Sequence, residues 1–283
     1  MGVKQSILFL GIFSLLLSSC GQKNNSEKLE NKDRQSIING LEVTSSDPIA
    51  KYTVLIHSYQ LAKNTDPKPD SFSLCTGVII GKKTVLTAAH CLSKEDPLKK
   101  ISVMEVFFAQ SSVSLKNAPK AFGTLVSPHP YYRSNALDEH FDLAVVKLAT
   151  EIPSGFASIS ILPSEVELYV GDLVFPAGYG RTIDISVKES PTTSYRLNKS
   201  AGLRIVEDWG TFFYVDQTKG SGVCSGDSGG PTFVQSKGKL YLVGITHGFA
   251  IEKGKPSTCL SKGMLVKVQT YKAWILKTMG NEI

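Results

Sequence analysis

A serine in a glycine-lined turn is the residue of this chain best suited to do chemistry. The run Gly226-Asp227-Ser228-Gly229-Gly230-Pro231 sets Ser228 beside a carboxylate. Glycines let the backbone adopt turn conformations closed to other residues, so amide N–H groups can point at a carbonyl oxygen bonded to the serine. Taken alone, a run rich in Gly and Ser is more often a surface loop. Nucleophilic catalysis by Ser228 therefore requires partners elsewhere in the sequence.

A serine hydroxyl needs a base to take its proton and a third group to orient that base. Among the five histidines, His90 has the most suitable setting, Leu86-Thr87-Ala88-Ala89-His90-Cys91. An apolar run typical of a strand ends there in small residues that leave room for an imidazole. His129 lies in a turn-like segment and is predicted to be structural, and His57 and His140 lack any such frame.

The orienting carboxylate is predicted at Asp142. This residue opens Asp142-Leu143-Ala144-Val145-Val146-Lys147-Leu148, the pattern of a buried strand. A charge at the mouth of an apolar strand is costly unless it has a partner, and a histidine N–H is a suitable one. Asp138 and Glu139, a few residues earlier, are predicted to be solvated loop acids.

Together these residues resemble the chymotrypsin-like (trypsin-fold) serine peptidase family. Its three catalytic blocks are matched in their usual order, His90, Asp142, Ser228, with separations of 52 and 86 residues that also resemble the family. The similarity extends from about Ile37 to Met279. The resemblance implies an acyl-enzyme mechanism in which His90 is the base, Asp142 orients it, and the amides of Gly226 and Ser228 form the oxyanion hole. It implies a peptide or protein substrate and neither a metal nor an organic cofactor.

The pattern outside the catalytic blocks is that of an all-β protein. Short apolar runs broken by Gly, Pro, Asn and Ser predict antiparallel barrels: Tyr52–Ile56, Val78–Ile80, Val103–Phe108 and Leu240–Ile245. The segment Gln269 to Met279 spaces its apolar residues like one face of a helix. The resemblance implies two antiparallel six-stranded Greek-key barrels and a short C-terminal helix, with the triad in the cleft between the barrels.

A second group of matches concerns activation. Ile37-Ile38-Asn39-Gly40 resembles the mature N-terminus of the family, and Gly178-Tyr179-Gly180 resembles its Gly-Trp-Gly turn with Tyr in the Trp position. The resemblance implies that cleavage frees the Ile37 ammonium to pair with Asp227, which shapes the oxyanion hole. Arg34-Gln35-Ser36 precedes Ile37, so no basic residue stands immediately before the cut. The activating protease is therefore not expected to be trypsin-like, unless trimming follows a cut after Arg34.

The residue expected at the base of the primary specificity pocket is Gly222, six residues before Ser228. Trypsin-like members place an aspartate there, so the absence of a carboxylate argues against a preference for Arg or Lys. We expect an uncharged apolar or aromatic side chain to fit. The remaining pocket residues implied by the resemblance are Val223, Thr246, His247, Gly248 and Gly263. His247 replaces the usual Trp, and Thr246 replaces the usual Ser but keeps a hydroxyl that can reach Asp142.

Four of the five cysteines flank the catalytic residues. The resemblance implies the disulfides Cys75–Cys91 and Cys224–Cys259, and such bridges require an oxidising compartment. The fifth, Cys20, ends the run Leu17-Ser18-Ser19-Cys20, which resembles a bacterial lipobox whose cysteine is lipidated. The alternative is an ordinary signal peptide that happens to end in cysteine.

These features divide the chain into three parts. Residues 1–19 carry Lys4 and then an apolar run too short to span a bilayer, as a lipoprotein-type signal peptide does. Residues 20–36 are polar and predict a flexible tether or propeptide. Residues 37–283 form the predicted peptidase domain. The expected location is the bacterial cell envelope, lipid-anchored through Cys20, or the periplasm, with extracellular release if activation cuts the tether.

Composition excludes other function classes. The chain is 42% hydrophobic and 20% charged, which is ordinary for a soluble globular protein, and its net charge is +6, or +4 without residues 1–36. No basic cluster is interleaved with aromatic residues, so nucleic acid is not an expected partner. No cluster of His and Cys has metal-ligand spacing. We expect a monomer. A catalytically silent binding module on the same fold and an esterase remain as alternatives, although the esterase normally carries its serine on a strand-to-helix elbow that this sequence does not predict.

Overall fold

The computed structural model describes residues 37–62, 71–92, 100–133, 139–186, 196–251, 254 and 258–280. The predicted signal peptide, Cys20 and the tether up to Ser36 lie outside the described residues. Within the described ranges, no helix is long and apolar enough to cross a membrane.

The first half of the described chain forms a closed antiparallel barrel. Its strands follow one another around the ring in the order β2-β3-β4-β7-β6-β5. Their bounds are β2 Thr53–Ala62, β3 Ser71–Gly81, β4 Thr84–Thr87, β5 Lys100–Phe107, β6 Lys120–Pro128 and β7 Ala144–Leu148. β4 and β7 pair through Thr87 and Ala144, so the end of one strand meets the start of the other.

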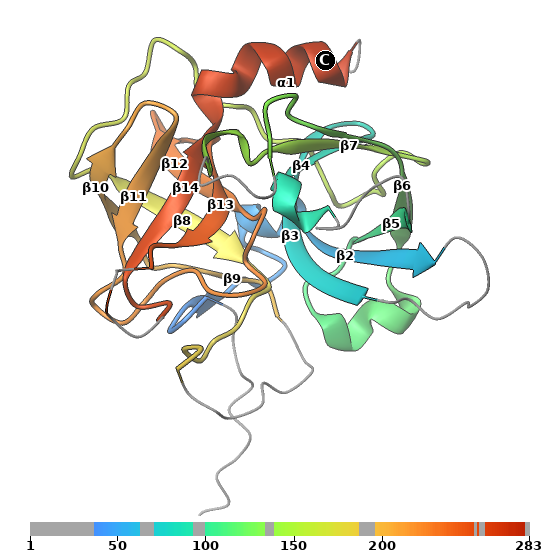
Figure 1. The fold of residues 1–283 in the computed structure, drawn as a ribbon, viewed down its shortest axis with the longest axis horizontal. Helices are drawn as coiled ribbons and strands as arrows, with labels where there is room; N and C mark the ends of the chain where they lie inside the picture. The colour runs from blue at the N-terminus through green and yellow to red at the C-terminus, as the bar shows by residue number, and fades with distance from the viewer. Residues whose placement is uncertain are drawn as a thin grey trace, which may run out of the picture. The chain divides into compact units, whose positions relative to one another are not determined.

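The second half forms another antiparallel barrel, which lies beside the first in Figure 1. Its strands run β8-β10-β11-β14-β13-β12, and a pairing of β12 with β8 closes the ring. Their bounds are β8 Leu173–Gly178, β10 Leu203–Asp208, β11 Phe212–Asp216, β12 Pro231–Ser236, β13 Lys239–Phe249 and β14 Lys262–Lys267. Two short strands, β1 Leu41–Glu42 and β9 Asn198–Lys199, extend the sheet next to β8. The predicted fold of two six-stranded barrels is confirmed.

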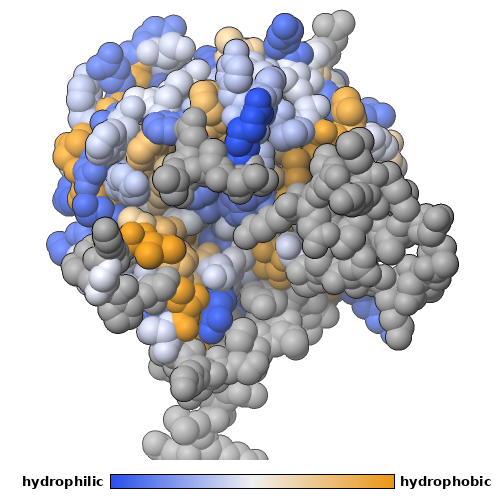
Figure 2. Space-filling model, in the orientation of Figure 1, coloured by the Kyte–Doolittle hydropathy of each residue, from blue (hydrophilic) through white to orange (hydrophobic). Residues whose placement is uncertain are grey.

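A continuous apolar cluster joins the barrels. It fills the first barrel with side chains such as Leu55, Ile79 and Leu86, and continues to Phe233 and Ile245 of the second. All five of these side chains are fully buried, and each is worth roughly 1.5–3 kcal/mol relative to an exposed position. On the face drawn in Figure 2, hydrophilic and hydrophobic residues are intermixed over the described surface. The buried apolar side chains that the two barrels share therefore hold them together.

The predicted short C-terminal helix is present. A 3₁₀ turn, Val268–Tyr271, precedes the α-helix α1, Lys272–Met279. The tyrosine hydroxyl of this turn donates a hydrogen bond to the carbonyl of His140, and Lys147 on β7 donates to the carbonyl of Met279. These bonds fix the helix on the first barrel, above β7 in Figure 1.

His129 lies in an aromatic cluster beneath this helix. Its ring stacks on Phe141 at 4.9 Å between centroids and meets Trp274 edge-on at 4.7 Å. Its Nδ1 accepts a hydrogen bond from the amide of Tyr131, and burial lowers the pKa of the imidazole. His129 therefore stays neutral and packs against the residue before Asp142, in agreement with its predicted structural role.

Both predicted disulfides are present. Cys75 and Cys91 join β3 to the turn that carries His90, with 6.2 Å between their Cα atoms, and Cys224 and Cys259 are 5.2 Å apart. Each bridge restricts the conformations open to the unfolded chain, which contributes about 2–4 kcal/mol to the stability of the folded state. Two disulfides of this kind are typical of an exported protein.

Candidate active site

His90 and Asp142 meet at one end of the first barrel. The chain leaves β4 through Ala88 and turns in a 3₁₀ turn, Ala89–Cys91, while Asp142 lies just before β7. Because β4 and β7 are paired and antiparallel, both residues are delivered to the same edge. Asp142 Oδ2 lies 2.6 Å from His90 Nδ1, and Oδ1 accepts the backbone N–H of His90 at 2.8 Å.

The surroundings keep Asp142 ionised. The residue is fully buried, and burial alone raises the pKa of a carboxyl. The electrostatic interaction with His90 and the hydrogen bonds from His247 and His90 outweigh burial and hold the pKa of Asp142 well below its usual range. An ionised carboxylate only accepts hydrogen bonds, so His90 carries its proton on Nδ1. This tautomer leaves the lone pair of His90 Nε2 available as a base.

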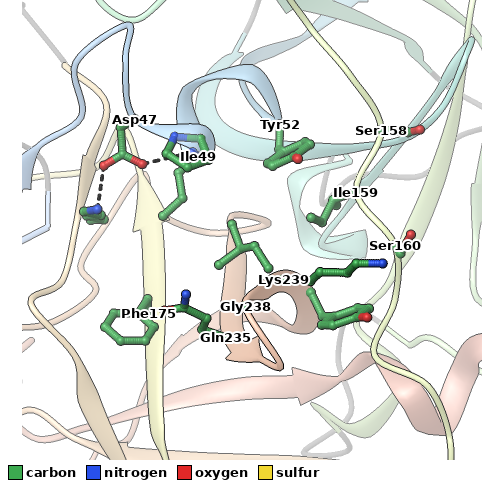
Figure 3. Close-up of a pocket in the computed structure, with 14 residues that line it drawn as sticks. Asp47, Ile49, Tyr52, Ser158, Ile159, Ser160, Phe175, Gln235, Gly238 and Lys239 are labelled. Carbon is green, nitrogen blue, oxygen red and sulfur yellow. Dashed lines mark hydrogen bonds and ion pairs between the residues drawn. The ribbon is translucent and has the colours of Figure 1, made fainter.

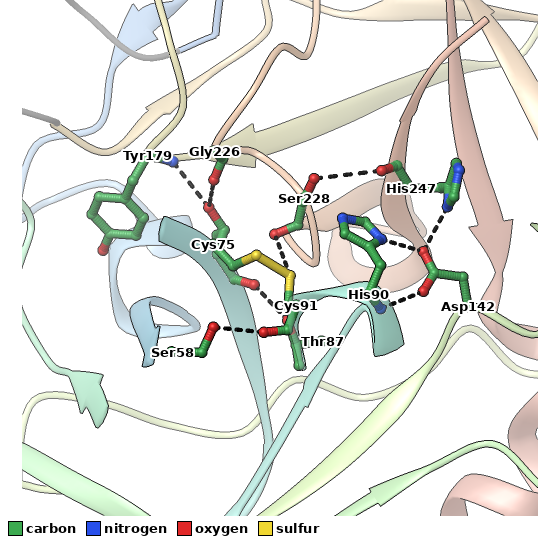
Figure 4. The surroundings of a disulfide bond; sticks show 11 residues. Ser58, Cys75, Thr87, His90, Cys91, Asp142, Tyr179, Gly226, Ser228 and His247 are labelled. Atoms are coloured by element: carbon green, nitrogen blue, oxygen red, sulfur yellow. Dashed lines mark hydrogen bonds and ion pairs between the residues drawn. A yellow bond between two sulfur atoms is a disulfide. The ribbon is translucent and has the colours of Figure 1, made fainter. Parts of the chain in front are cut away.

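His247 supplies a third donor to this carboxylate, after the backbone and the ring of His90. Its Nδ1 lies 2.6 Å from Asp142 Oδ2, and its ring centroid is 5.4 Å from that of His90. Figure 4 shows the two imidazoles converging on the same carboxylate from β13 and from the turn after β4. The hydroxyl expected in this position, Thr246 Oγ1, is buried without a hydrogen-bond partner among the described residues. Thr246 therefore does not form the hydrogen bond to Asp142 that its hydroxyl could have made, and its neighbour His247 contacts this carboxylate.

Ser228 is held in position by both barrels. Its carbonyl accepts the amide of Thr76 on β3 at 2.8 Å, and the amide of the next residue, Gly229, donates to the carbonyl of Thr246 on β13 at 2.8 Å. Gly229 has a φ of +78°, and a Cβ there would lie 2.0 Å from Thr87 Oγ1. Only glycine fits this junction. The Ser228 loop is therefore fastened between β3, β4 and β13.

The serine hydroxyl does not donate to His90 in this structure. Ser228 Oγ donates to the carbonyl of His247 at 3.4 Å, and no hydrogen bond between Ser228 and the His90 ring is formed among the described residues. Figure 4 shows Ser228 beside His90, on the side of the ring away from Asp142. In unliganded sites such bonds are often long and tighten only with substrate.

The backbone amides of Gly226 and Ser228 are candidates for an anion site. The amides of Asp227, Gly229 and Gly230 all donate to backbone carbonyls. Within the part of the chain that the structure describes, the amides of Gly226 and Ser228 donate no hydrogen bond inside the protein. Gly226 has a φ of +98°, a left-handed conformation that favours glycine. These are the two donors predicted to stabilise a developing oxyanion.

A family model described as Trypsin matches residues 55–275, which include all three residues of the predicted triad. The chain belongs to the trypsin family. Peptide-bond hydrolysis with a serine nucleophile is the chemistry of this family, and the trypsin-family chain described here carries the residues for it in the expected order.

Curated relatives of this trypsin-family chain include proteins named as an elastase and as a kallikrein. Chymotrypsin-like elastase family member 1 of Macaca fascicularis is 25% identical over 233 residues, which cover 74% of this chain and 80% of the relative. Submandibular glandular kallikrein-9 of Rattus norvegicus is 29% identical over 228 residues, or 73% and 81% of the two chains. Complement C1s-1 subcomponent of Mus musculus is 30% identical over 234 residues, covering 72% of this chain and 32% of the relative.

Solved structures show the same fold. Mouse neuropsin, described as a serine protease, aligns with a TM-score of 0.62 at 22% identity, covering 86% of this chain and 100% of the other. HL collagenase aligns with a TM-score of 0.65 at 19% identity, covering 87% and 100%. At these identities the alignments establish the two-barrel fold.

Asp227 is enclosed by the Gly178-Tyr179-Gly180 segment. Its Oδ1 accepts the amide of Gly180 at 2.8 Å, and its Oδ2 accepts the amide of Cys224 at 2.9 Å. Burial raises the pKa of Asp227 to about 7, although these two hydrogen bonds act in the opposite direction. The Tyr179 side chain is buried, and its hydroxyl donates to the carbonyl of Ala109 at 2.6 Å. Tyrosine thus anchors the segment against the first barrel.

Replacing Gly180 by alanine is expected to destabilise this enclosure. A Cβ at Gly180 would lie 2.5 Å from the Asp227 carboxyl carbon and 2.6 Å from its backbone nitrogen, so backbone must move. We expect the free energy of unfolding to fall by about 3 kcal/mol. Gly248→Ala is the matched control, because a Cβ there meets nothing within 4 Å. Urea unfolding of both variants checks this, and equal midpoints would contradict it.

Ile37 lies next to the base of the predicted specificity pocket. The residue is fully buried, and its neighbour Ile38 exchanges two backbone hydrogen bonds with Gly222, at 2.9 and 3.2 Å. Ile37 has a φ of +56°, which is strained for a β-branched residue. The segment expected to become the N-terminus is therefore already hydrogen-bonded to Gly222, which precedes Asp227 by five residues in the sequence.

Sequence reasoning missed Gln217, which lies among the pocket residues. A Cβ on Gly222 would meet the Gln217 side chain at 2.3 Å, and a Cβ on Gly263 would meet Gln217 Oε1 at 2.3 Å. The signal was present, since Phe213 and Val215 on β11 are fully buried and Gln217 continues their alternation.

A separate pocket lies away from these residues. It has a volume of about 570 Å³ and is shown in Figure 3. Its lining includes Asp47, Tyr52, Phe175 and Lys239, and none of the predicted site residues.

Proposed function

We propose that this chain is an exported serine endopeptidase that cleaves proteins or peptides through an acyl-enzyme on Ser228. The observation that carries the proposal is the His90 imidazole, fixed by Asp142 at 2.6 Å and placed beside the anchored Ser228 loop. Family membership supplies the reaction class, and the retained triad favours an enzyme over a silent binding module.

The proposed reaction uses only groups of this chain. Ser228 Oγ attacks the peptide carbonyl carbon while His90 Nε2 takes its proton, and the same nitrogen then gives that proton to the leaving amine. Asp142 stabilises the imidazolium formed in between. The amides of Gly226 and Ser228 donate to the oxyanion, each worth on the order of 10²–10³ in rate. Water activated by His90 then hydrolyses the acyl-enzyme.

Activation is proposed to follow cleavage before Ile37. The new ammonium would neutralise Asp227, a fully buried carboxyl whose pKa is raised by burial and whose hydrogen-bond donors among the described residues are two backbone amides. Cleavage would also relieve the strained Ile37, because an N-terminal residue has no φ. N-terminal sequencing of the active protein tests the site, and an active species that retains residues 20–36 would contradict it.

Anchoring through a lipidated Cys20 is the proposed state before activation. It rests on the sequence Leu17-Ser18-Ser19-Cys20 and on the polar tether that follows. Cleavage before Ile37 would then both activate the enzyme and detach it from the membrane. The residue before the scissile bond is proposed to be uncharged, since Gly222 supplies no carboxylate.

Peptide hydrolysis is tested with a chain that begins at Ile37 and with its Ser228→Ala variant. A fluorogenic peptide library, varied at the residue before the scissile bond, should be cleaved by the first protein, and kcat of the variant should be lower by about 10⁶-fold. A fluorophosphonate should label Ser228 alone. A folded chain that neither cleaves nor labels would favour the binding module.

A further inference from the structure

The predicted specificity pocket has an open mouth and a closed floor. A Cβ on Gly248, at the mouth, would meet nothing within 4 Å. At the floor, Gly222, Val223 and Gly263 are all buried. Between the two floor glycines lies the side chain of Gln217, which has no exposed surface. A side chain added at either glycine would therefore collide with Gln217.

The position of Gln217 follows from the strand register. On β11, Val215 pairs with Gly263 of β14, and side chains two residues apart point to the same face. Gln217 therefore extends along the face of Val215, past the glycine at position 263. Because glycine has no side chain, the amide of Gln217 reaches the space that a residue at Gly222 would otherwise fill.

Hydrogen bonds hold the amide there. Gln217 Nε2 donates to the carbonyl of Val223 at 3.2 Å and to that of Cys259 at 2.5 Å, and Oε1 accepts the amide of Val223 at 2.8 Å. Both N–H groups of the side chain are thus used inside the protein. Moving the amide aside would leave buried polar groups unpaired, which is costly. Gln217 therefore forms a fixed floor of the predicted specificity pocket, and its side chain has no N–H group left to bind a substrate.

We propose that Gln217 determines specificity by restricting the residue before the scissile bond to a small uncharged side chain, of about the size of alanine or valine. This inference rests on the proposed peptidase function and narrows it. The expectation of an aromatic side chain made no allowance for Gln217, and aromatic rings need the depth that this side chain occupies. The floor also blocks conversion to Arg specificity by Gly222→Asp alone, because the new Cβ would collide with Gln217 at 2.3 Å.

The test compares alanine and phenylalanine before the scissile bond in otherwise identical fluorogenic peptides. For the chain that begins at Ile37, we expect kcat/KM to be at least tenfold higher with alanine. Gln217→Gly should raise the Phe-to-Ala ratio at least 100-fold by opening the floor. Gln217→Met is the matched control, since it keeps the length but loses the hydrogen bonds, and it should retain the small-residue preference.

A second readout does not depend on peptide turnover. Peptidyl phosphonates that carry alanine or phenylalanine in the same position label Ser228 covalently, and their rates of labelling should follow the same ratios. A wild-type preference for phenylalanine would overturn the inference, as would an unchanged ratio in a Gln217→Gly protein that labels normally. Failure of every phosphonate and peptide to react would instead refute the proposed function.

Discussion

Asp142→Asn is expected to lower kcat about 10⁴-fold without unfolding the protein. The carboxylate accepts three donors: the backbone N–H of His90, its Nδ1–H, and the Nδ1–H of His247. An asparagine side chain has one acceptor oxygen and an NH₂ group that faces a donor in place of the second. To accept a hydrogen bond from this NH₂ group, His90 must carry its proton on Nε2 and not on Nδ1. In that tautomer Nε2 cannot accept the serine proton.

Steady-state kinetics with an alanine-containing peptide measure this loss in the chain that begins at Ile37. The matched control is Asp208→Asn, which removes an exposed carboxylate that pairs with Lys267 on the second barrel. Circular dichroism should be unchanged in both variants. A loss of less than tenfold in Asp142→Asn would mean that this carboxylate does not orient the base.

The second large effect concerns Asp227 before activation. In a chain that begins at Gly21, where Ile37 has no free amine, burial raises the pKa of Asp227 to about 7, against about 4 when unfolded. Between these values the unfolded chain has released its proton and the folded chain has kept it. The free energy of unfolding therefore falls as the pH rises from about 4 to about 7, by about 4 kcal/mol in total.

Two comparisons isolate this contribution. Asp227→Asn should remove the fall, so the uncleaved variant is more stable than the uncleaved parent at pH 8. In the chain that begins at Ile37, an ammonium partner should also remove the fall, and there Asp227→Asn should cost roughly 3–5 kcal/mol together with most of the activity. Urea unfolding at pH 4.5, 6 and 8, with Ser228→Ala in every protein to prevent self-digestion, measures these differences. The same pH dependence with and without Asp227 would exclude the carboxyl as its source.

Three compact sequence blocks carry the family resemblance, and that resemblance implied the disulfides and the two-barrel fold that the structure confirms. Gln217 lies outside the motif that contains Ser228, and its place in the pocket depends on the pairing of β11 with β14. Strand alternation alone shows that Gln217 is buried. It does not show that two glycines on separate segments leave the space into which the side chain extends.

The contact of His247, and not Thr246, with Asp142 has a different cause. The pairing of β13 with β14 shifts register between Thr246 and Gly248, a local irregularity that changes the direction of the side chains around it. By analogy with the usual serine, the sequence indicates that the hydroxyl of Thr246 can reach Asp142. Nothing in the local residue pattern marks this bulge, so the imidazole contact could be found only in three dimensions.

The attachment of Ser228 to strands of both barrels has a consequence for how activity is lost. The amide of Thr76 on β3 and the carbonyl of Thr246 on β13 hold the residues that carry the nucleophile and its amide donors. Neither barrel alone contains a complete set of catalytic groups. A small separation of the barrels would therefore abolish activity while each barrel stays folded. Heat or denaturant should accordingly abolish turnover before the β-sheet signal begins to change.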